Sequence, residues 1–387
     1  MKDKTLNKKK SLSLMGICAI MLASSITVMV GTAIISAVPE IAVRYGLPLN
    51  LSSWLITVPA LGVIAGAVPF GRLIDRIGAY RVCIIGLAFY GVFGITGFLM
   101  PGICTLFVSR FLLGVATAAV MTSGTALISE FYHGDKRLKM IAVQGMALEI
   151  GGIVFLSLGG FLAEISWRGP FFIYTIGFVA LLWIYCFVPS PGKRLLPAVS
   201  EQDAAKVLPP RNRNIWPVVT LAFVAAFIFF SGVVSLPVHL QHTLGHSPSF
   251  TGNFLAFVSI MAVVAAGIMP KIVSKLTPKG CLCAAFVSYA FSYGLFAVSV
   301  ETTILLVAAM LLGIGFGLTI PLINHLTVER SKKENIGRNL ALYSIMTSLG
   351  QFLSSLLTTL DIGYSPFMVI AVMATVAFLG TLAMFRN

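Results

Sequence analysis

The stretch GRLIDRIGAYRV, residues 71–82, decides the fold, because it is a short charged segment between two long apolar runs. Its charged residues are Arg72, Asp75, Arg76 and Arg81. Gly71 and Gly78 let the backbone turn tightly between two helices that stay close. An acid among bases in so short a connector pairs locally or with the end of a neighbouring helix. We therefore predict a charged turn between two membrane helices.

The composition excludes a soluble globular protein. Hydrophobic residues make up 58% of the 387 positions and only 10% are charged, whereas a soluble chain carries about 25% charged residues. The six cysteines fall mostly inside apolar runs, and they show neither a secreted disulfide framework nor the spacing of a metal site. We predict an all-α integral membrane protein that holds no metal and no cofactor.

Apolar runs of roughly 20 residues recur along the whole chain, which is the signal of transmembrane helices. They fall near 13–37, 51–70, 82–100, 103–128, 140–163 and 170–188, and again near 215–238, 251–270, 280–298, 303–327, 339–360 and 365–385. We predict twelve transmembrane helices in two six-helix bundles, residues 1–188 and 215–387. A cytoplasmic linker, residues 189–214, joins them because this stretch is polar and rich in proline.

The positions of Lys and Arg predict the orientation in the membrane. Of the 27 bases, 24 lie on the side that holds both termini and the linker, while Arg44 and Arg168 lie on the other side. Cytoplasmic loops carry the excess of Lys and Arg, so both termini are predicted to be cytoplasmic. The same asymmetry explains the net charge of +14: the bases face anionic lipid headgroups rather than nucleic acid.

An internal repeat links the two halves at a constant offset of 199 residues. Leu112-Leu113-Gly114 aligns with Leu311-Leu312-Gly313, Glu130 with Glu329, Arg72 with Lys271 and Arg76 with Lys275. The charged stretch thus recurs in a weaker form, with Ser274 in the place of Asp75. Two parallel six-helix repeats that enclose a site near the middle of the membrane form a transporter architecture.

Between these spans, the 71–82 stretch resembles the loop between the second and third helices of the major facilitator superfamily, patterned G-x-L-x-D-R-x-G-x-x-R. The matching residues are Gly71, Leu73, Asp75, Arg76, Gly78 and Arg81. Ala79 and Tyr80 stand where the family often has Arg-Lys. The resemblance implies a major facilitator fold and a gating role for this loop, in which Asp75 ties the two bundles together when the carrier is open to the outside.

Glu149 is the one acid of thirteen that falls near the middle of a predicted span. A carboxylate inside the membrane is costly and usually serves a substrate pathway or a proton relay. The alternative is a protonated acid that hydrogen-bonds to a neighbouring helix and contributes only to packing. We predict that Glu149 couples transport to protons.

Arg110 is the base that falls within a predicted span. Arg110 and Gly114 resemble the fourth-helix motif of proton-coupled facilitators, which implies that Arg110 assists proton transfer or sets the field of the cavity. Hydroxyls and carbonyls of the first helix, at Ser24 and Thr27, are candidates to satisfy the guanidinium, and both residues are also candidates for the cavity or for helix contacts. A direct pair with Glu149 is not expected, because Glu149 lies roughly 13 Å nearer the cytoplasm at 1.5 Å per residue. A purely structural arginine is the alternative.

Two other spans carry residues expected to face the cavity or a neighbouring helix. The fifth span contains Gly145, Gly151, Gly152, Gly159 and Gly160. Glycines let helices approach closely, but the Gly-Pro signature of family antiporters has no proline here, so antiport and symport both stay open. The eleventh span has a polar stripe that includes Gln351, and we expect such a stripe to serve contacts between helices more than ligand binding.

The end of the first span, residues 36–40 (SAVPE), also resembles the A-x-P ending of drug-efflux members. We predict a proton-driven exporter of small apolar or cationic molecules, a monomer in the cell membrane. The alternative is a metabolite or sugar carrier on the same fold, a uniporter or symporter, which is expected to place more Asn, Gln and Trp in its spans. No paired acids, HExxH motif or catalytic Cys–His set supports an enzyme.

Overall fold

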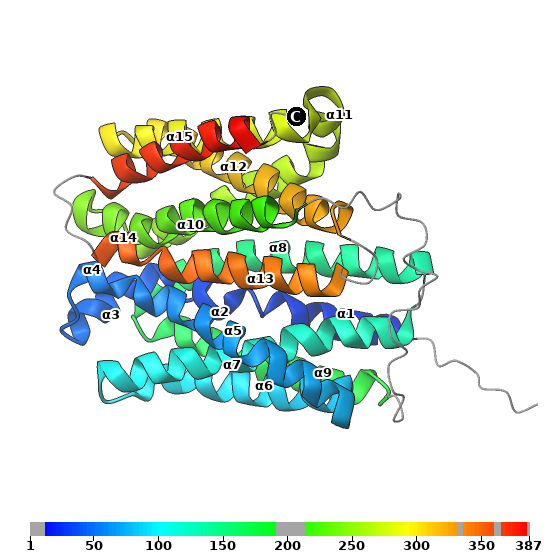
Figure 1. The fold of residues 1–387 in the computed structure, drawn as a ribbon. Coiled ribbons are helices and arrows are strands. Elements are labelled where there is room, and N and C mark those ends of the chain that lie inside the picture. The colour runs from blue at the N-terminus through cyan, green and yellow to red at the C-terminus, as the bar shows by residue number, and fades with distance from the viewer. Residues whose placement is uncertain (1–11, 133, 191–213, 332–335, 360–364, 385–387) are drawn as a thin grey trace, which may run out of the picture.

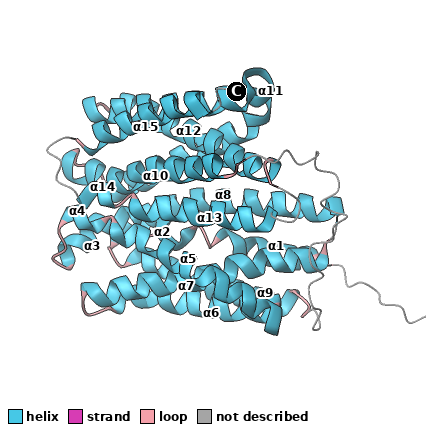
Figure 2. Ribbon diagram, in the orientation of Figure 1, coloured by secondary structure: helices cyan, strands magenta, loops and turns pink. Residues whose placement is uncertain are grey.

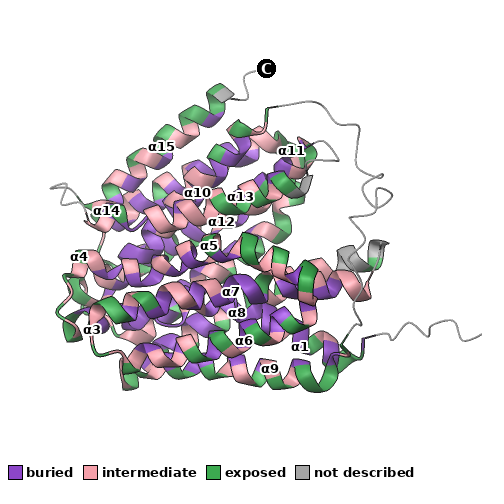
Figure 3. Cartoon of the chain, turned by 60° about the horizontal axis from the view of Figure 1, so that its bottom comes forward, coloured by how far each residue is buried: buried purple, intermediate pink, exposed green. Residues whose placement is uncertain are grey.

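The protein is seen in a computed structural model that describes residues 12–132, 134–190, 214–331, 336–359 and 365–384. Its helices run side by side in one elongated bundle (Figure 1), and no strand occurs among the described residues (Figure 2). Buried side chains gather in the middle of the bundle, and exposed ones lie on its flanks (Figure 3). The all-α prediction is confirmed. Most of the predicted linker, residues 191–213, lies outside the described residues.

The first half of the chain forms helices that bend or break at several points. Its elements are α1 Leu14–Ser25, α2 Met29–Thr32, η1 Ile35–Ala37, α3 Val38–Arg44, α4 Leu49–Ser52, α5 Trp54–Ile77, α6 Ala79–Thr96, η2 Gly97–Leu99, α7 Ile103–Phe131, α8 Gly134–Ile165, η3 Gly169–Thr175 and α9 Ile176–Phe187. The predicted first span is broken, with a bend of 49° between α1 and the helical stretch from Met29 to Arg44.

The second half is built in the same way. Its elements are α10 Trp216–Val238, η4 His239–Thr243, α11 Pro248–Val298, α12 Thr302–Glu329, α13 Ile336–Leu353, α14 Leu356–Thr359 and α15 Pro366–Met384. The 51-residue α11 is interrupted at Thr277, where φ is 64° and ψ is 161°. It therefore supplies two of the predicted spans, the eighth and the ninth.

Ten helices in the described ranges are long and apolar enough to cross a membrane, and the bent first pair makes an eleventh candidate. Because the long α11 is two spans joined at Thr277, these helices account for the twelve predicted crossings. The chain is a multi-pass membrane protein.

The charged stretch at residues 71–82 is not the loop that we predicted. Helix α5 continues through Gly71, Asp75 and Arg76 and ends only at Ile77. Gly78 alone makes the turn, with φ at 89°, a value that favours glycine because it has no Cβ. A Cβ added at Gly71 would meet nothing within 4 Å. The expectation that two glycines shape this turn is therefore wrong for Gly71.

The two halves repeat the same packing. In the first half, α7 lies so close to α5 that a Cβ on Gly114 would overlap the carbonyl oxygen of Pro59. In the second half, a Cβ on Gly313 of α12 would overlap the carbonyl oxygen of Val258 in α11. Both members of the second pair lie 199 residues after their counterparts, which is the offset found in the sequence. Gly114 is thus a helix-contact residue.

The halves are joined at one end of the bundle, which we call the closed end, where α3, α4 and α14 lie (Figure 1, left). Hydroxyls of Thr57 and Ser355 are 2.7 Å apart, and the Trp54 indole donates to the Thr359 hydroxyl over 2.9 Å. The ring of Trp54 also meets that of Phe352 edge to face, with centroids 5.0 Å apart. Helices α5, α13 and α14 therefore form one polar and aromatic seam across the halves.

A second seam joins α8 to α11 at the same end. A Cβ on Gly160 would lie 2.8 Å from the carbonyl oxygen of Pro248 and 2.9 Å from the Cα of Gly252. Nearby, the Gln241 side chain donates to the carbonyl of Ser36 over 2.8 Å. In the described part of the chain, the hydrogen bonds that join the halves lie at this end. We call the opposite end, where α1 and α13 begin and α9 ends, the open end.

Candidate functional site

Glu149 lies at the midpoint of α8, inside a candidate membrane span, and its side chain is exposed. Leu156 and Gly160, seven and eleven residues further on, share its helix face and contact Gly252 of α11. Exposed apolar side chains cover a neighbouring face: Met146, Ile150 and Val154. Glu149 is therefore on the face that α8 turns towards the second half, and not on its apolar flank.

More polar side chains are exposed within spans, on helices of both halves. They include Thr125 on α7, Asn324 and His325 on α12, and Ser344 on α13. Polar residues within a membrane span usually face a water-filled passage or the protein interior rather than lipid. With the closed end sealed, Glu149 and these groups suit a site that small molecules reach from the open end.

Arg110 is completely buried, with 0% of its surface exposed. Its Nη1 donates to the hydroxyl of Tyr174 over 2.9 Å, and its guanidinium carbon lies 4.9 Å from the ring centroid of Phe171. The Tyr174 hydroxyl in turn donates to the carbonyl of Val30, just after the break in the first span, over 3.1 Å. The remaining Nε and Nη2 atoms have no hydrogen-bond partner among the described residues. A single phenol thus connects the buried charge to the broken helix.

Ser24 and Thr27 do not bind Arg110, but Ser24 is a contact between helices, one of the two roles expected of it. Ser24 Oγ accepts a hydrogen bond from Gln144 Nε2 over 2.8 Å, and the Thr27 hydroxyl donates to the carbonyl of Ser24 over 2.7 Å. Thr27 lies in the break between α1 and α2, where a hydroxyl readily bonds to its own backbone. Gln144 therefore ties α8 to the first helix, and the first helix reaches Arg110 through a carbonyl instead.

Gly151 and Gly152 of the fifth span lie at contacts with the first helix, whereas a Cβ added at Gly145 would meet nothing within 4 Å. A Cβ on Gly151 would lie 2.7 Å from the Cβ of Ser25, so α8 and α1 pack at backbone distance there. Gly152 is less crowded, with Val28 Cγ1 at 3.5 Å. Gln351 is half-buried in α13, and its backbone carbonyl accepts a hydrogen bond from the Ser354 hydroxyl over 2.6 Å.

The charged end of α5 lies at the open end of the bundle. Asp75, Arg76 and Arg81 are all exposed, and Asp75 forms no hydrogen bond or ion pair with another described residue. Because the halves meet at the closed end, the predicted tie from Asp75 to the second half is not made in this conformation. Its role as a gate stays a prediction.

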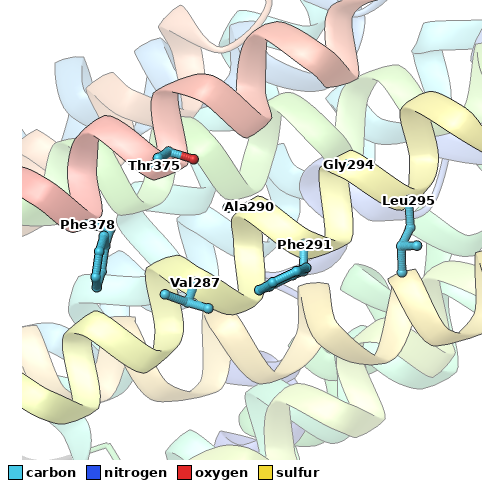
Figure 4. A pocket seen from close by; sticks show the side chains of 7 residues that line it. All are labelled: Val287, Ala290, Phe291, Gly294, Leu295, Thr375 and Phe378. Atoms are coloured by element: carbon cyan, nitrogen blue, oxygen red, sulfur yellow. The ribbon is translucent and has the colours of Figure 1, made fainter.

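A groove of about 420 Å³ lies on the flank of the second half, between α11 and α15 (Figure 4). Val287, Phe291 and Phe378 line it, and Thr375 brings a hydroxyl to its edge. Phe291 is 65% exposed. The groove is apolar and lies away from the contact between the halves, so we do not assign it to the transport site.

Sequence reasoning missed Tyr174 and Gln144. Both stand in or beside apolar runs, and a phenol or amide in such a place needs a partner for its polar atoms. That rule identifies them as candidates, but it does not name the partner. Arg110 and Tyr174 are 64 residues apart, so only the packing of α7 against η3 brings them together.

The family model of the Major Facilitator Superfamily matches residues 20–355. The chain therefore belongs to the Major Facilitator Superfamily, and it is a transporter, not an enzyme. The predictions of family, fold class and transport role are confirmed.

Among curated proteins, the chain is similar to Multidrug resistance protein 2 of Bacillus subtilis (strain 168), with 27% identity over 316 residues that cover 78% of each chain. It is also similar to the puromycin resistance protein pur8 of Streptomyces alboniger, with 32% identity over 47% of this chain and 35% of that protein. A solved bacterial homolog of the human lysosomal transporter Spinster superposes with a TM-score of 0.79 at 14% identity, over 96% of each chain. That last likeness concerns the fold alone.

Proposed function

We propose that this transporter exports small apolar or cationic compounds from the cell in exchange for protons. The observation that carries the proposal is Glu149, an exposed carboxylate inside a candidate membrane span, on the face that α8 turns to the second half. The similarity to multidrug and puromycin resistance proteins supports export of such compounds. The membrane spans carry few charged residues, and such an apolar environment suits apolar or cationic substrates better than sugars.

The proposed orientation follows the Lys and Arg count, with both termini in the cytoplasm of a cell whose plasma membrane holds the protein. In this orientation the closed end faces outwards. The conformation is then open to the cytoplasm, and a compound from the cytoplasm or the inner leaflet reaches Glu149 from the open end. Export requires the seams at Thr57, Ser355 and Gly160 to part while the open ends of the halves meet.

Glu149 is placed to couple these movements to protons. When the open end closes, the face of α8 that holds Glu149 approaches α11, and water leaves the carboxylate. A carboxylate that faces water in one conformation and a dry interface in the other binds a proton with different affinity in the two conformations. Glu149 can then take up a proton on one side of the membrane and release it on the other. The pH gradient across the membrane thereby drives the movement of substrate.

The proposal is tested with Glu149→Gln in proteoliposomes that contain a fluorescent substrate dye. The amide keeps the shape of the side chain but does not titrate, so uphill export driven by a pH gradient is expected to be lost. Exchange of dye down its own gradient is expected to continue. Glu164→Gln is the matched control, because Glu164 is an exposed acid near the end of the same helix, and this variant is expected to retain both activities.

Three outcomes contradict the assignment in different ways. Uphill export at the wild-type rate in Glu149→Gln shows that another group couples to protons. Loss of both export and exchange shows that Glu149 only packs or binds substrate. Export by the wild type that is indifferent to the pH gradient contradicts proton coupling itself.

A further inference from the structure

A polar pocket of about 450 Å³ opens at the closed end of the first half. Its lining residues come from the end of α3, the connection from α6 to α7 and the connection from α8 to η3; α3 lies at the left of Figure 1. Two arginines line it, Arg44 and Arg168. They are the only Lys or Arg residues at the closed end of the described chain. Arg44 and Arg168 are 124 residues apart in the sequence, and the fold places both of them at this pocket.

The walls of the pocket are held by aromatic contacts. The Tyr45 hydroxyl donates to the carbonyl of Met100 over 2.8 Å, and the Tyr45 ring meets that of Trp167 edge to face at 6.0 Å. The Arg168 guanidinium carbon lies 5.1 Å from the Trp167 ring centroid. Burial raises the pKa of the Tyr45 phenol, and the positive charges of Arg168 and Arg44 oppose that rise. The positive charges of both guanidinium groups therefore act on the same group, the Tyr45 phenol, in the wall of the pocket.

Neither arginine is neutralised by a carboxylate. Glu40 and Glu164 precede Arg44 and Arg168 by four residues each and are exposed, yet neither base forms an ion pair with another described residue. Both arginines are themselves exposed. Their donors are free for an anion, and a guanidinium binds a phosphate through two parallel hydrogen bonds.

The pocket lies at the level of lipid headgroups. Arg44 ends α3, Trp167 follows α8, and Met100 connects two spans, so all three mark the ends of membrane crossings. Trp and Tyr are enriched at this level because one part of each ring system is apolar and another is polar. Exposed apolar side chains, which we call the apolar flank, lie beside these residues: Leu99, 64% exposed, lines the pocket, Phe172, 52% exposed, packs on the pocket residue Phe98, and Ile165, 70% exposed, precedes Trp167 by two residues.

We propose that this pocket binds the phosphate headgroup of an anionic phospholipid from the leaflet at the closed end. The two arginines hold the phosphate, Trp167 and Tyr45 border the glycerol region, and the acyl chains lie against the apolar flank. This flank favours a lipid over free phosphate, because phosphate in solution gains nothing from Leu99 or Phe172. The site lies apart from Glu149 and does not depend on the direction or coupling of transport.

The experiment is native mass spectrometry of the full chain, purified in micelles with equal amounts of phosphatidylglycerol and phosphatidylcholine. The wild type is compared with Arg44→Gln/Arg168→Gln and with Arg44→Lys/Arg168→Lys. Lipids on the basic open end give the same background in all three, so the difference isolates the pocket. Retention of phosphatidylglycerol is expected to fall roughly fivefold for each arginine and about 25-fold for the Gln pair. The Lys pair keeps the charges and is expected to recover most of the retention.

Equal retention of phosphatidylglycerol by the wild type and the Gln pair overturns the proposal, as does equal retention of the two lipids by the wild type. Displacement of the lipid by millimolar inorganic phosphate alone assigns the pocket to a soluble phosphate and also overturns it. Both arginines are exposed, so the variants are expected to fold, and a monodisperse elution profile checks this. The Lys pair tests the proposal even if the Gln pair aggregates.

Discussion

Replacing Tyr174 by Phe tests how the buried charge of Arg110 is stabilised. The substitution removes one hydroxyl, which accepts from Arg110 Nη1 and donates to the Val30 carbonyl. The ring stays, so its packing against Tyr90, at a centroid distance of 5.8 Å, is kept and no cavity of side-chain size forms. Arg110 then has no hydrogen-bond partner among the described residues, because its Nε and Nη2 already lack one.

The expected cost is a loss of about 1.5–3 kcal/mol in the free energy of unfolding, the range for a hydrogen bond to a charged group. Loss of the donor to the Val30 carbonyl adds about 0.6 kcal/mol, the average for a hydrogen bond within a membrane protein. Tyr174 and Arg110 are both 0% exposed, so water from the surface does not replace the hydroxyl.

Tyr90→Phe is the matched control. Tyr90 is also 0% exposed, and its hydroxyl donates to the Ile26 carbonyl over 2.6 Å but forms no hydrogen bond with a charged group of the described chain. Its loss is expected to cost about 0.6 kcal/mol. Both free energies of unfolding are measured by titration with sodium dodecyl sulfate in mixed micelles, followed by circular dichroism.

The comparison has a clear refuting result. If Tyr174→Phe costs no more than Tyr90→Phe, the guanidinium does not depend on the phenol, and internal water or another carbonyl satisfies it. If the double substitution with Arg110→Leu is as stable as the wild type, the buried charge contributes nothing net to folding, and its retention serves transport.

Three further predictions concern the charged end of α5, the closed end of the bundle and the orientation in the membrane. Asp75→Asn is expected to lower transport while substrate binding stays largely intact; equal loss of both, measured by flux and by equilibrium binding, indicates misfolding instead. Gly160→Val places a branched side chain against α11, where even a Cβ would lie 2.8 Å from a carbonyl oxygen, so spin labels at the closed end should show longer distances than in the wild type. In a background without the exposed native cysteines, Val300→Cys should react with an impermeant thiol reagent outside intact cells and Arg338→Cys should not; the reverse pattern contradicts the orientation.

The candidate site was only partly accessible from the sequence. Glu149 stands out as an acid inside an apolar run, and Arg110 as a base inside another, because a charge in such a place is costly wherever it points. The sequence does not determine the direction in which each of these two side chains points. Glu149 is exposed on the face turned to α11, whereas Arg110 is sealed inside the first half, and nothing in the two local sequences separates these outcomes.

The charged stretch at 71–82 shows the same limit on a smaller scale. Its pattern led to the family, because glycines and charges between apolar runs are properties of neighbouring residues. The end of α5 was misplaced, because Asp75 and Arg76 are compatible with a helix that extends beyond the membrane. Only Gly78, with φ at 89°, shows where the helix stops.

The sequence alone determined that this is a helical membrane transporter of two repeated halves. Run lengths, the placement of Lys and Arg and the 199-residue offset are properties read along one dimension, and the bilayer leaves few folds that satisfy them. The tertiary structure decided which end is closed, which residue binds Arg110 and where Arg44 and Arg168 meet. These depend on pairs such as Thr57 and Ser355, 298 residues apart, whose contact follows from the packing of whole helices and not from the residues beside them in the chain.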